Sequence, residues 1–129
     1  MRASHMRAER IPKDLLGKWG GAVLEKGWTN IPNALLEKQS ELKLTNSEMM
    51  LLIHIISFSH KATSPAFPSI TTLASRLDQH PRTVQRTVGR LVAKGIVNKI
   101  IRSKSPHDLG MTNIYSLDPL KAKLSQMTF

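Results

Sequence analysis

The chain has 129 residues and no cysteine, and its 19 lysines and arginines against 9 acidic residues give a formal net charge of +10. This length allows one compact domain with an extra arm or helix at each end. The absence of cysteine excludes a disulfide scaffold and sulfur-ligated metal sites, and it fits a reducing cytoplasm. The longest apolar run is too short to cross a bilayer, and no secretory signal is present. Since a small domain this basic typically binds a polyanion, the position of the charge is the main question.

The N-terminal part of the sequence carries little regular pattern. Residues 1–5 resemble the remnant of a cloning vector and are left out of the fold prediction. Residues 6–26 form a basic segment, which we expect to be either a mobile arm or a helix. Asn33 can cap an amphipathic helix, which we predict over residues 33–41.

The centre of the sequence predicts a buried helix with a defined start. Thr45 and Glu48 match a capping box, in which the threonine hydroxyl accepts a hydrogen bond from a first-turn amide and the glutamate reaches back to the cap. The run from Met49 to Phe58 is apolar on nearly all sides. A helix of this kind is buried on most sides, so we expect it at the centre of the domain.

Two further helices and a strand pair follow. Ser69 can cap a short helix that ends near residue 77, and Pro81 suits the first turn of a second helix that stops at Gly95. Residues 96–103 and 112–117 are β-branched or alternating, which predicts a hairpin with a long loop.

This order of elements predicts a winged helix-turn-helix domain over residues 27–117. The fold class is therefore mainly α with a small β-hairpin, or α+β, with one or more additional N-terminal helices. Residues 118–129 form a C-terminal tail that can make one short helix.

The positive charge is concentrated on these later elements. From Arg76 to His107 there are eight lysines and arginines and one acid, a net charge of +7 within 32 residues. A surface that only keeps the protein soluble would mix both signs more evenly. The distribution therefore indicates double-stranded DNA as the partner.

The second helix of the pair has two different faces. Helical phase places Val84, Val88, Leu91 and Val92 toward the core. The opposite face and its flanks carry the base-reading candidates, which are Arg82, Thr83, Gln85, Arg86 and Arg90. Arginine can pair with two acceptors of guanine, and glutamine can do the same for adenine. Gly89 on this face indicates either close approach of a duplex or tight helix packing, because glycine is otherwise unfavourable there.

A second group of residues is expected to contact the sugar-phosphate backbone and to position the protein without reading bases. It lies around the helix pair and on the hairpin. Its members are Ser69, Thr71, His80, Lys94, Lys99, Arg102, Lys104 and His107.

Several strings in this region resemble winged helix-turn-helix domains of phage and plasmid replication proteins and of small bacterial regulators. They are Pro68–Leu77, His80–Arg86, Leu91–Ile96 and Thr112–Tyr115, and the entry Gly27–Asn33 resembles the front end of O-type phage replication initiators. The resemblance implies that Arg82, Thr83, Gln85 and Arg86 enter the major groove. Many relatives carry serine before the Arg-Thr-Val string, whereas this sequence has His80 and Pro81, so the usual hydroxyl cap is missing.

We therefore expect a sequence-specific DNA-binding protein of the cytoplasm, associated with a nucleoid or plasmid, that regulates transcription. The alternative is a plasmid or phage replication-initiation or partition protein, which binds an origin and recruits a replication or partition partner. A domain that binds only protein is a further alternative. The nine acids are scattered, and there is no phosphate-binding loop, so we expect no enzyme activity, no metal and no cofactor.

We also expect a homodimer, because a lone recognition helix reads only a few base pairs. Apolar residues in the terminal segments are not needed by the minimal fold and are candidates for its interface. They are Leu15, Leu16, Trp19, Val23, Leu24, Leu120 and Leu124.

Overall fold

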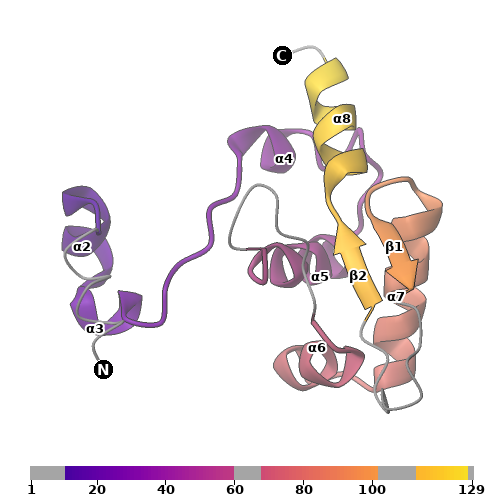
Figure 1. Cartoon of the computed structure of the whole chain (residues 1–129). Helices are drawn as coiled ribbons and strands as arrows, with labels where there is room; N and C mark the ends of the chain where they lie inside the picture. The colour runs from indigo at the N-terminus through magenta and orange to yellow at the C-terminus, as the bar shows by residue number, and fades with distance from the viewer. Residues whose placement is uncertain (1–10, 60–67, 102–112, 128–129) are drawn as a thin grey trace. The chain divides into compact units, whose positions relative to one another are not determined.

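The computed structural model describes residues 11–59, 68–101 and 113–127 (Figure 1). The chain divides into two compact units, residues 1–30 and 31–129. The first unit contains α2 (Lys13–Trp19) and α3 (Gly21–Leu24), which contact each other.

The second unit is mainly helical and carries one small sheet. Its elements are α4 (Asn33–Glu37), α5 (Asn46–Ile56), α6 (Ile70–Leu77), α7 (Pro81–Ala93), β1 (Asn98–Ile101), β2 (Asn113–Ser116) and α8 (Asp118–Gln126). The α+β fold class is confirmed, and the arrangement is winged-helix-like. No helix within the three described stretches is long and apolar enough to cross a bilayer.

The predicted helix over residues 33–41 is shorter in the structure. α4 ends at Glu37, and a series of turns leads to Lys43, whose backbone takes a positive φ of 59°. The turns place Leu42 and Leu44 in the core. A continuing helix would point residues two positions apart in nearly opposite directions, so it could not bury both.

α5 begins as the sequence predicts. The Glu48 amide donates to the Thr45 hydroxyl at 3.2 Å, and the Thr45 amide donates to Glu48 Oε1 at 2.9 Å, which completes the capping box. Leu51, Leu52 and Ile55 are almost completely buried. α6 and α7 both pack against this helix, so α5 is central to the core.

The two-stranded sheet adds residues from the C-terminal part of the chain to the core. β1 and β2 pair antiparallel, with Lys99 opposite Tyr115, and the tyrosine is 1% exposed. Figure 1 shows β2 leading directly into α8. Leu120 of α8 is buried and Leu124 packs beside it, so both belong to this unit's core and are not available for the predicted dimer interface.

Candidate nucleic-acid interface

α6 and α7 form a helix-turn-helix with defined caps at the turn. Asp78 ends α6 in the left-handed conformation, with φ of 51°, and His80 precedes α7. The Arg82 amide donates to Nδ1 of His80 at 3.1 Å. The imidazole therefore takes the place of the hydroxyl cap found in the proteins that the sequence resembles, and Pro81 occupies the first turn as predicted.

The far end of α7 also stops as the sequence predicts. Gly95 has φ of 70°, its amide donates to Val92 O at 3.0 Å, and the Ile96 amide donates to Leu91 O at the same distance. Such a left-handed residue satisfies the last carbonyls of a helix and suits glycine. α7 is thus fixed at both ends, which gives its outer face a defined position.

The inner face of α7 is a buried stripe of Val84, Thr87, Val88 and Leu91. Val92 was expected on this face but is 37% exposed. It lies about 80° around the helix from Val84 by helical phase, so it falls at the edge of the stripe. The Thr87 hydroxyl donates to the Thr83 carbonyl at 3.0 Å, which offsets the cost of burying this polar group.

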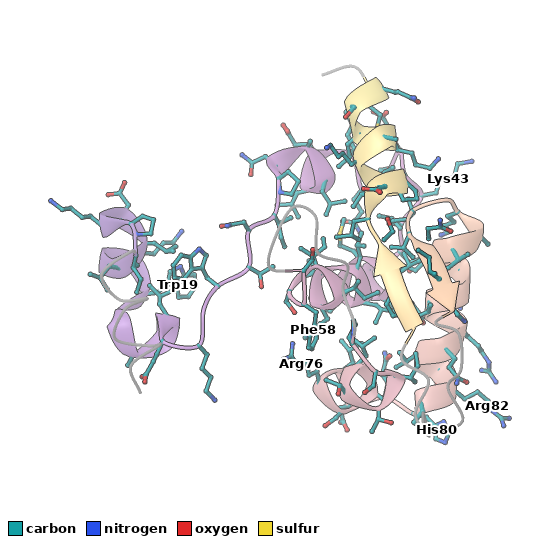
Figure 2. All side chains as sticks on the ribbon, viewed as in Figure 1. Trp19, Lys43, Phe58, Arg76, His80 and Arg82 are labelled. Carbon is teal, nitrogen blue, oxygen red and sulfur yellow. The ribbon has the colours of Figure 1, made fainter. Side chains whose placement is uncertain are left out.

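The outer face of α7 presents the predicted base-reading side chains to solvent. Arg82, Thr83, Gln85 and Arg86 are all exposed. Figure 2 shows Arg82 pointing away from the body of the second unit, next to the His80 cap. These four side chains can donate or accept hydrogen bonds. They lie on the first half of α7, where the base-reading residues of helix-turn-helix proteins lie.

The surface above Gly89, on the same face of α7, is open. A methyl group built at Gly89 would meet nothing within 4 Å. Within the residues that the structure describes, no neighbouring element packs closely against this glycine. Of the two predicted explanations, tight helix packing therefore has no support from this chain, and close approach of an external partner stays a prediction.

Arg90 and Lys94 differ from the other cations of α7 because both bind Glu48. Arg90 Nε donates to Glu48 Oε2 at 2.9 Å, and Lys94 Nζ donates to Glu48 Oε1 at 2.5 Å. Arg90 also donates to the Thr87 hydroxyl at 3.1 Å, and Lys94 donates to the Lys43 carbonyl at 2.6 Å. The Glu48 side chain is 1% exposed, so the flank of α7 is held by a buried acid.

The hydrogen bonds to Glu48 determine its protonation. Burial has the largest single effect and on its own would raise the pKa, but Lys94, the Thr45 amide and Arg90 all donate to the carboxylate. Together they lower the pKa of Glu48 from 4.5 to about 2. The carboxylate is therefore ionised at neutral pH, as a buried acid with several donors is expected to be.

Glu48 therefore changes the expected role of two candidates. The Arg90 guanidinium is oriented toward α5, on the flank of α7, although half of its side chain remains exposed. Lys94 is turned the same way and is 30% exposed. Both side chains already stabilise the position of α7, whereas Arg82 and Arg86 extend from its exposed face.

The backbone-contact candidates are more dispersed. Ser69 caps α6, accepting from the Thr72 amide at 3.0 Å, and Thr71 is exposed in the first turn. Lys99 is exposed on β1. Arg102, Lys104 and His107, predicted for the hairpin loop, lie outside the described residues.

Two side chains near the interface were not singled out by sequence reasoning. Glu48 was predicted only as part of a cap, and its pairing with α7 joins residues 42 and 46 positions apart. Arg76 stands over the Phe58 ring, 4.5 Å from its centroid, and donates to the Ser57 hydroxyl at 3.4 Å. Figure 2 shows this pair between α5 and α6. For Glu48, the signal available in the sequence was its position directly before the apolar run from Met49 to Phe58.

A metal site has no structural support in the described part of the chain. No group of three or more histidine, aspartate or glutamate residues there is placed to hold a metal ion.

Comparisons with known proteins give one consistent result. Residues 31–128 match the model of a protein family described as the DnaD N-terminal domain. The structure is similar to the crystal structure of the N-terminal domain of the DnaD protein from Geobacillus kaustophilus, with a TM-score of 0.58 and 27% sequence identity. This match covers 89% of the present chain and 88% of the other. No curated protein sequence is significantly similar to this chain.

The pairing of Glu48 predicts a loss of stability in acid. The pKa of Glu48 in the folded chain lies below its value of 4.5 in the unfolded chain, so the unfolded chain binds more protons between about pH 5 and pH 2. Stabilisation present above pH 5 is therefore lost as the pH falls through this window. We expect Glu48 to account for about 2 kcal/mol of this loss, less than the full shift implies because its partners are partly exposed.

Urea unfolding of Glu48→Gln and the unsubstituted chain across this pH range measures the effect. The variant should be less stable at pH 7 and should depend less on pH. Glu37→Gln, which removes an exposed carboxylate from α4, is the matched control. Equal pH dependence in Glu48→Gln and the unsubstituted chain would contradict the assignment.

Proposed function

The chain belongs to the DnaD N-terminal domain family, a replication-related family, and we propose that it is a double-stranded DNA-binding domain of a replication protein. Family membership favours this alternative over the regulation of transcription. In this proposal the protein acts in the cytoplasm on a nucleoid or plasmid origin and recruits a further replication protein. It binds and positions DNA and catalyses no reaction.

The observation that carries the proposal is the exposed face of α7. Four side chains able to pair with base edges are exposed on the part of α7 that precedes an open glycine, and the buried stripe on the opposite face turns them toward solvent. An α-helix fits the major groove, where every base pair presents a distinct pattern of donors and acceptors. Arg82, Thr83, Gln85 and Arg86 are the proposed base-reading residues.

The surrounding residues have a different proposed role. Thr71, His80 and Lys99 lie in the helix pair or on the sheet and would contact phosphates, together with Arg102, Lys104 and His107, which the sequence predicts for a hairpin loop. Such contacts set the register on the duplex and supply most of the salt dependence. In the proposal Arg90 stays paired with Glu48, and only the exposed part of its side chain can contact a phosphate.

Arg86 and Arg90 provide a test of this division, because they are the same residue type one helical turn apart. Arg86→Ala should weaken binding to the specific duplex by about 1–3 kcal/mol, with the unfolding free energy unchanged. Arg90→Ala should instead reduce the unfolding free energy by about 1–2 kcal/mol, because Glu48 loses one of two cationic partners.

The duplex for this test is first selected from a random pool, and binding is measured by fluorescence anisotropy. Parallel titration of random DNA separates base reading from phosphate binding. If the two variants lose the same binding energy and the same stability, the proposed division is wrong. If the unsubstituted chain does not bind duplex at low salt, the DNA-binding function itself is wrong.

Gly89→Ala tests how closely the partner approaches. The added methyl group meets open space in the free protein, and alanine is favoured over glycine inside a helix by about 1 kcal/mol. We therefore expect a more stable protein with weaker DNA binding. Thermal unfolding and anisotropy measure the two effects, and a stabilised variant with unchanged affinity would contradict close docking at this position.

We also propose a homodimer through the first unit. Leu16, Trp19 and Val23 are 39%, 53% and 63% exposed, which is unusual for a small unit that buries little else. Trp19→Ser should convert a dimer to a single chain of 14.4 kDa in sedimentation. Leu36→Ser, which removes an exposed apolar side chain from α4, should leave the dimer intact. A single-chain mass for the unsubstituted protein at micromolar concentration would contradict the proposal.

A further inference from the structure

A hollow of about 480 Å³ lies at the end of α7 that is distant from the helix-turn-helix turn. It is formed by three elements, namely the turn before α5, the end of α7, and α8. Figure 2 shows Lys43 near this end, whereas His80 and Arg82 lie at the opposite end of α7. Its lining residues are Glu41, Leu42, Lys43, Lys94, Lys123, Gln126 and Met127.

The charge of the lining is strongly unbalanced. In the part of the chain that the structure describes, the lining contains three lysines and one carboxylate, Glu41, which already accepts from Lys38 Nζ at 3.0 Å. Lys94 is held in place by Glu48 and the Lys43 carbonyl. Lys43 and Lys123 are exposed. The surface of the hollow is therefore positively charged.

The backbone around the hollow is held in an unusual form. Lys43 has φ of 59°, a conformation that L-residues other than asparagine and aspartate rarely adopt. Gln39 Nε2 donates to the Leu44 carbonyl at 3.1 Å and to Asn46 Oδ1 at 3.0 Å, which fixes the turn. Residues in sparsely populated backbone conformations are enriched at ligand-binding and other functional sites.

The second side of the hollow is fixed by packing. A methyl group built at Gly95 would come within 3.3 Å of Lys123 Cε, so the lysine stem lies across the end of α7. Leu42 is 7% exposed and Met127 is partly buried, and these two side chains give the hollow an apolar component.

We propose that this hollow binds a short acidic peptide segment of a partner protein, through lysine–carboxylate pairs and one apolar side chain. Charge complementarity carries the proposal, because the exposed ammonium groups of Lys43 and Lys123, next to a Lys94 that Glu48 already binds, attract an anionic partner. Among the described residues, the lining contains no arginine to bind a phosphate bidentately and no aromatic ring to stack a base, which favours carboxylates over nucleotides. The inference does not depend on DNA binding, because the hollow and the exposed arginines lie at opposite ends of α7.

The test uses the full chain and a fluorescein-labelled peptide of alternating glutamate and leucine, with a lysine–leucine peptide as the control for charge. Anisotropy should show binding of the acidic peptide only. Lys43→Gly and Lys123→Ala should each weaken it about threefold, as expected for partly exposed ion pairs. Lys121→Ala, which removes an exposed cation of α8 outside the hollow, should leave the affinity unchanged.

Two variants separate binding from folding. Lys43→Gly relieves the left-handed backbone and should raise the melting temperature while it weakens the peptide complex. Glu41→Gln removes the one carboxylate of the lining and should strengthen the complex about twofold, a gain that partial unfolding cannot produce.

Competition experiments distinguish an acidic peptide from other anions as the ligand of the hollow. At constant ionic strength, random duplex DNA and inorganic phosphate should not displace the acidic peptide. Amide NMR signals of Lys43, Lys123 and Gln126 should shift on titration, while those of Arg82 and Gln85 should not. The proposal is overturned by displacement with phosphate, which would indicate a simple anion site, by displacement with DNA, which would make the hollow part of the duplex surface, or by equal binding of both peptides.

Discussion

One buried carboxylate determines how α7 is presented. Removing an acid from water is costly unless several donors replace its hydration, and Glu48 receives donors from Thr45, Arg90 and Lys94. Two of these donors come from α7 and are one helical turn apart, so they restrict rotation of that helix about its own axis. The apolar stripe alone would tolerate a small rotation, because hydrophobic contacts are not directional. The directions of Arg82 and Arg86 therefore depend on an ion pair on another face.

α7 consequently serves two surfaces of different character. Its first half extends arginine, threonine and glutamine side chains into solvent, where geometry and hydrogen bonding can distinguish partners. Its last turn closes against α8 and the turn before α5, where Lys94 and its neighbours form a hollow. The two surfaces are related through one rigid element rather than through a flexible linker. Such a helix can hold two ligands at a fixed separation.

The sequence could predict features that depend on a few neighbouring residues. The capping box at Thr45, proline at the start of α7 and the left-handed Gly95 are all local, so their patterns were sufficient. The end of α4 was not predictable, because it depends on burying Leu42 and Leu44 against the rest of the fold.

The exposure of the candidate side chains on α7 was predicted more accurately than the pairing among them. Arg82 and Arg86 are exposed as helical phase suggested, but the same phase grouped Arg90 with them. Its partner, Glu48, lies 42 residues earlier, and no periodicity along the chain records such a contact. A charge count also records Glu48 only as one acid and does not show which cations it binds. The long-range ion pair is therefore a property of the tertiary structure that the sequence alone does not predict.

The placement of Glu48 has a consequence for local opening. Helix termini usually fray first, and each end does so independently. Here the start of α5 and the end of α7 are joined through Glu48. The same side chain completes the capping box of α5 and accepts a hydrogen bond from Lys94 at the C-cap of α7. Opening either terminus removes a hydrogen bond from Glu48, so we expect the opening of the two to be coupled despite their distance along the chain.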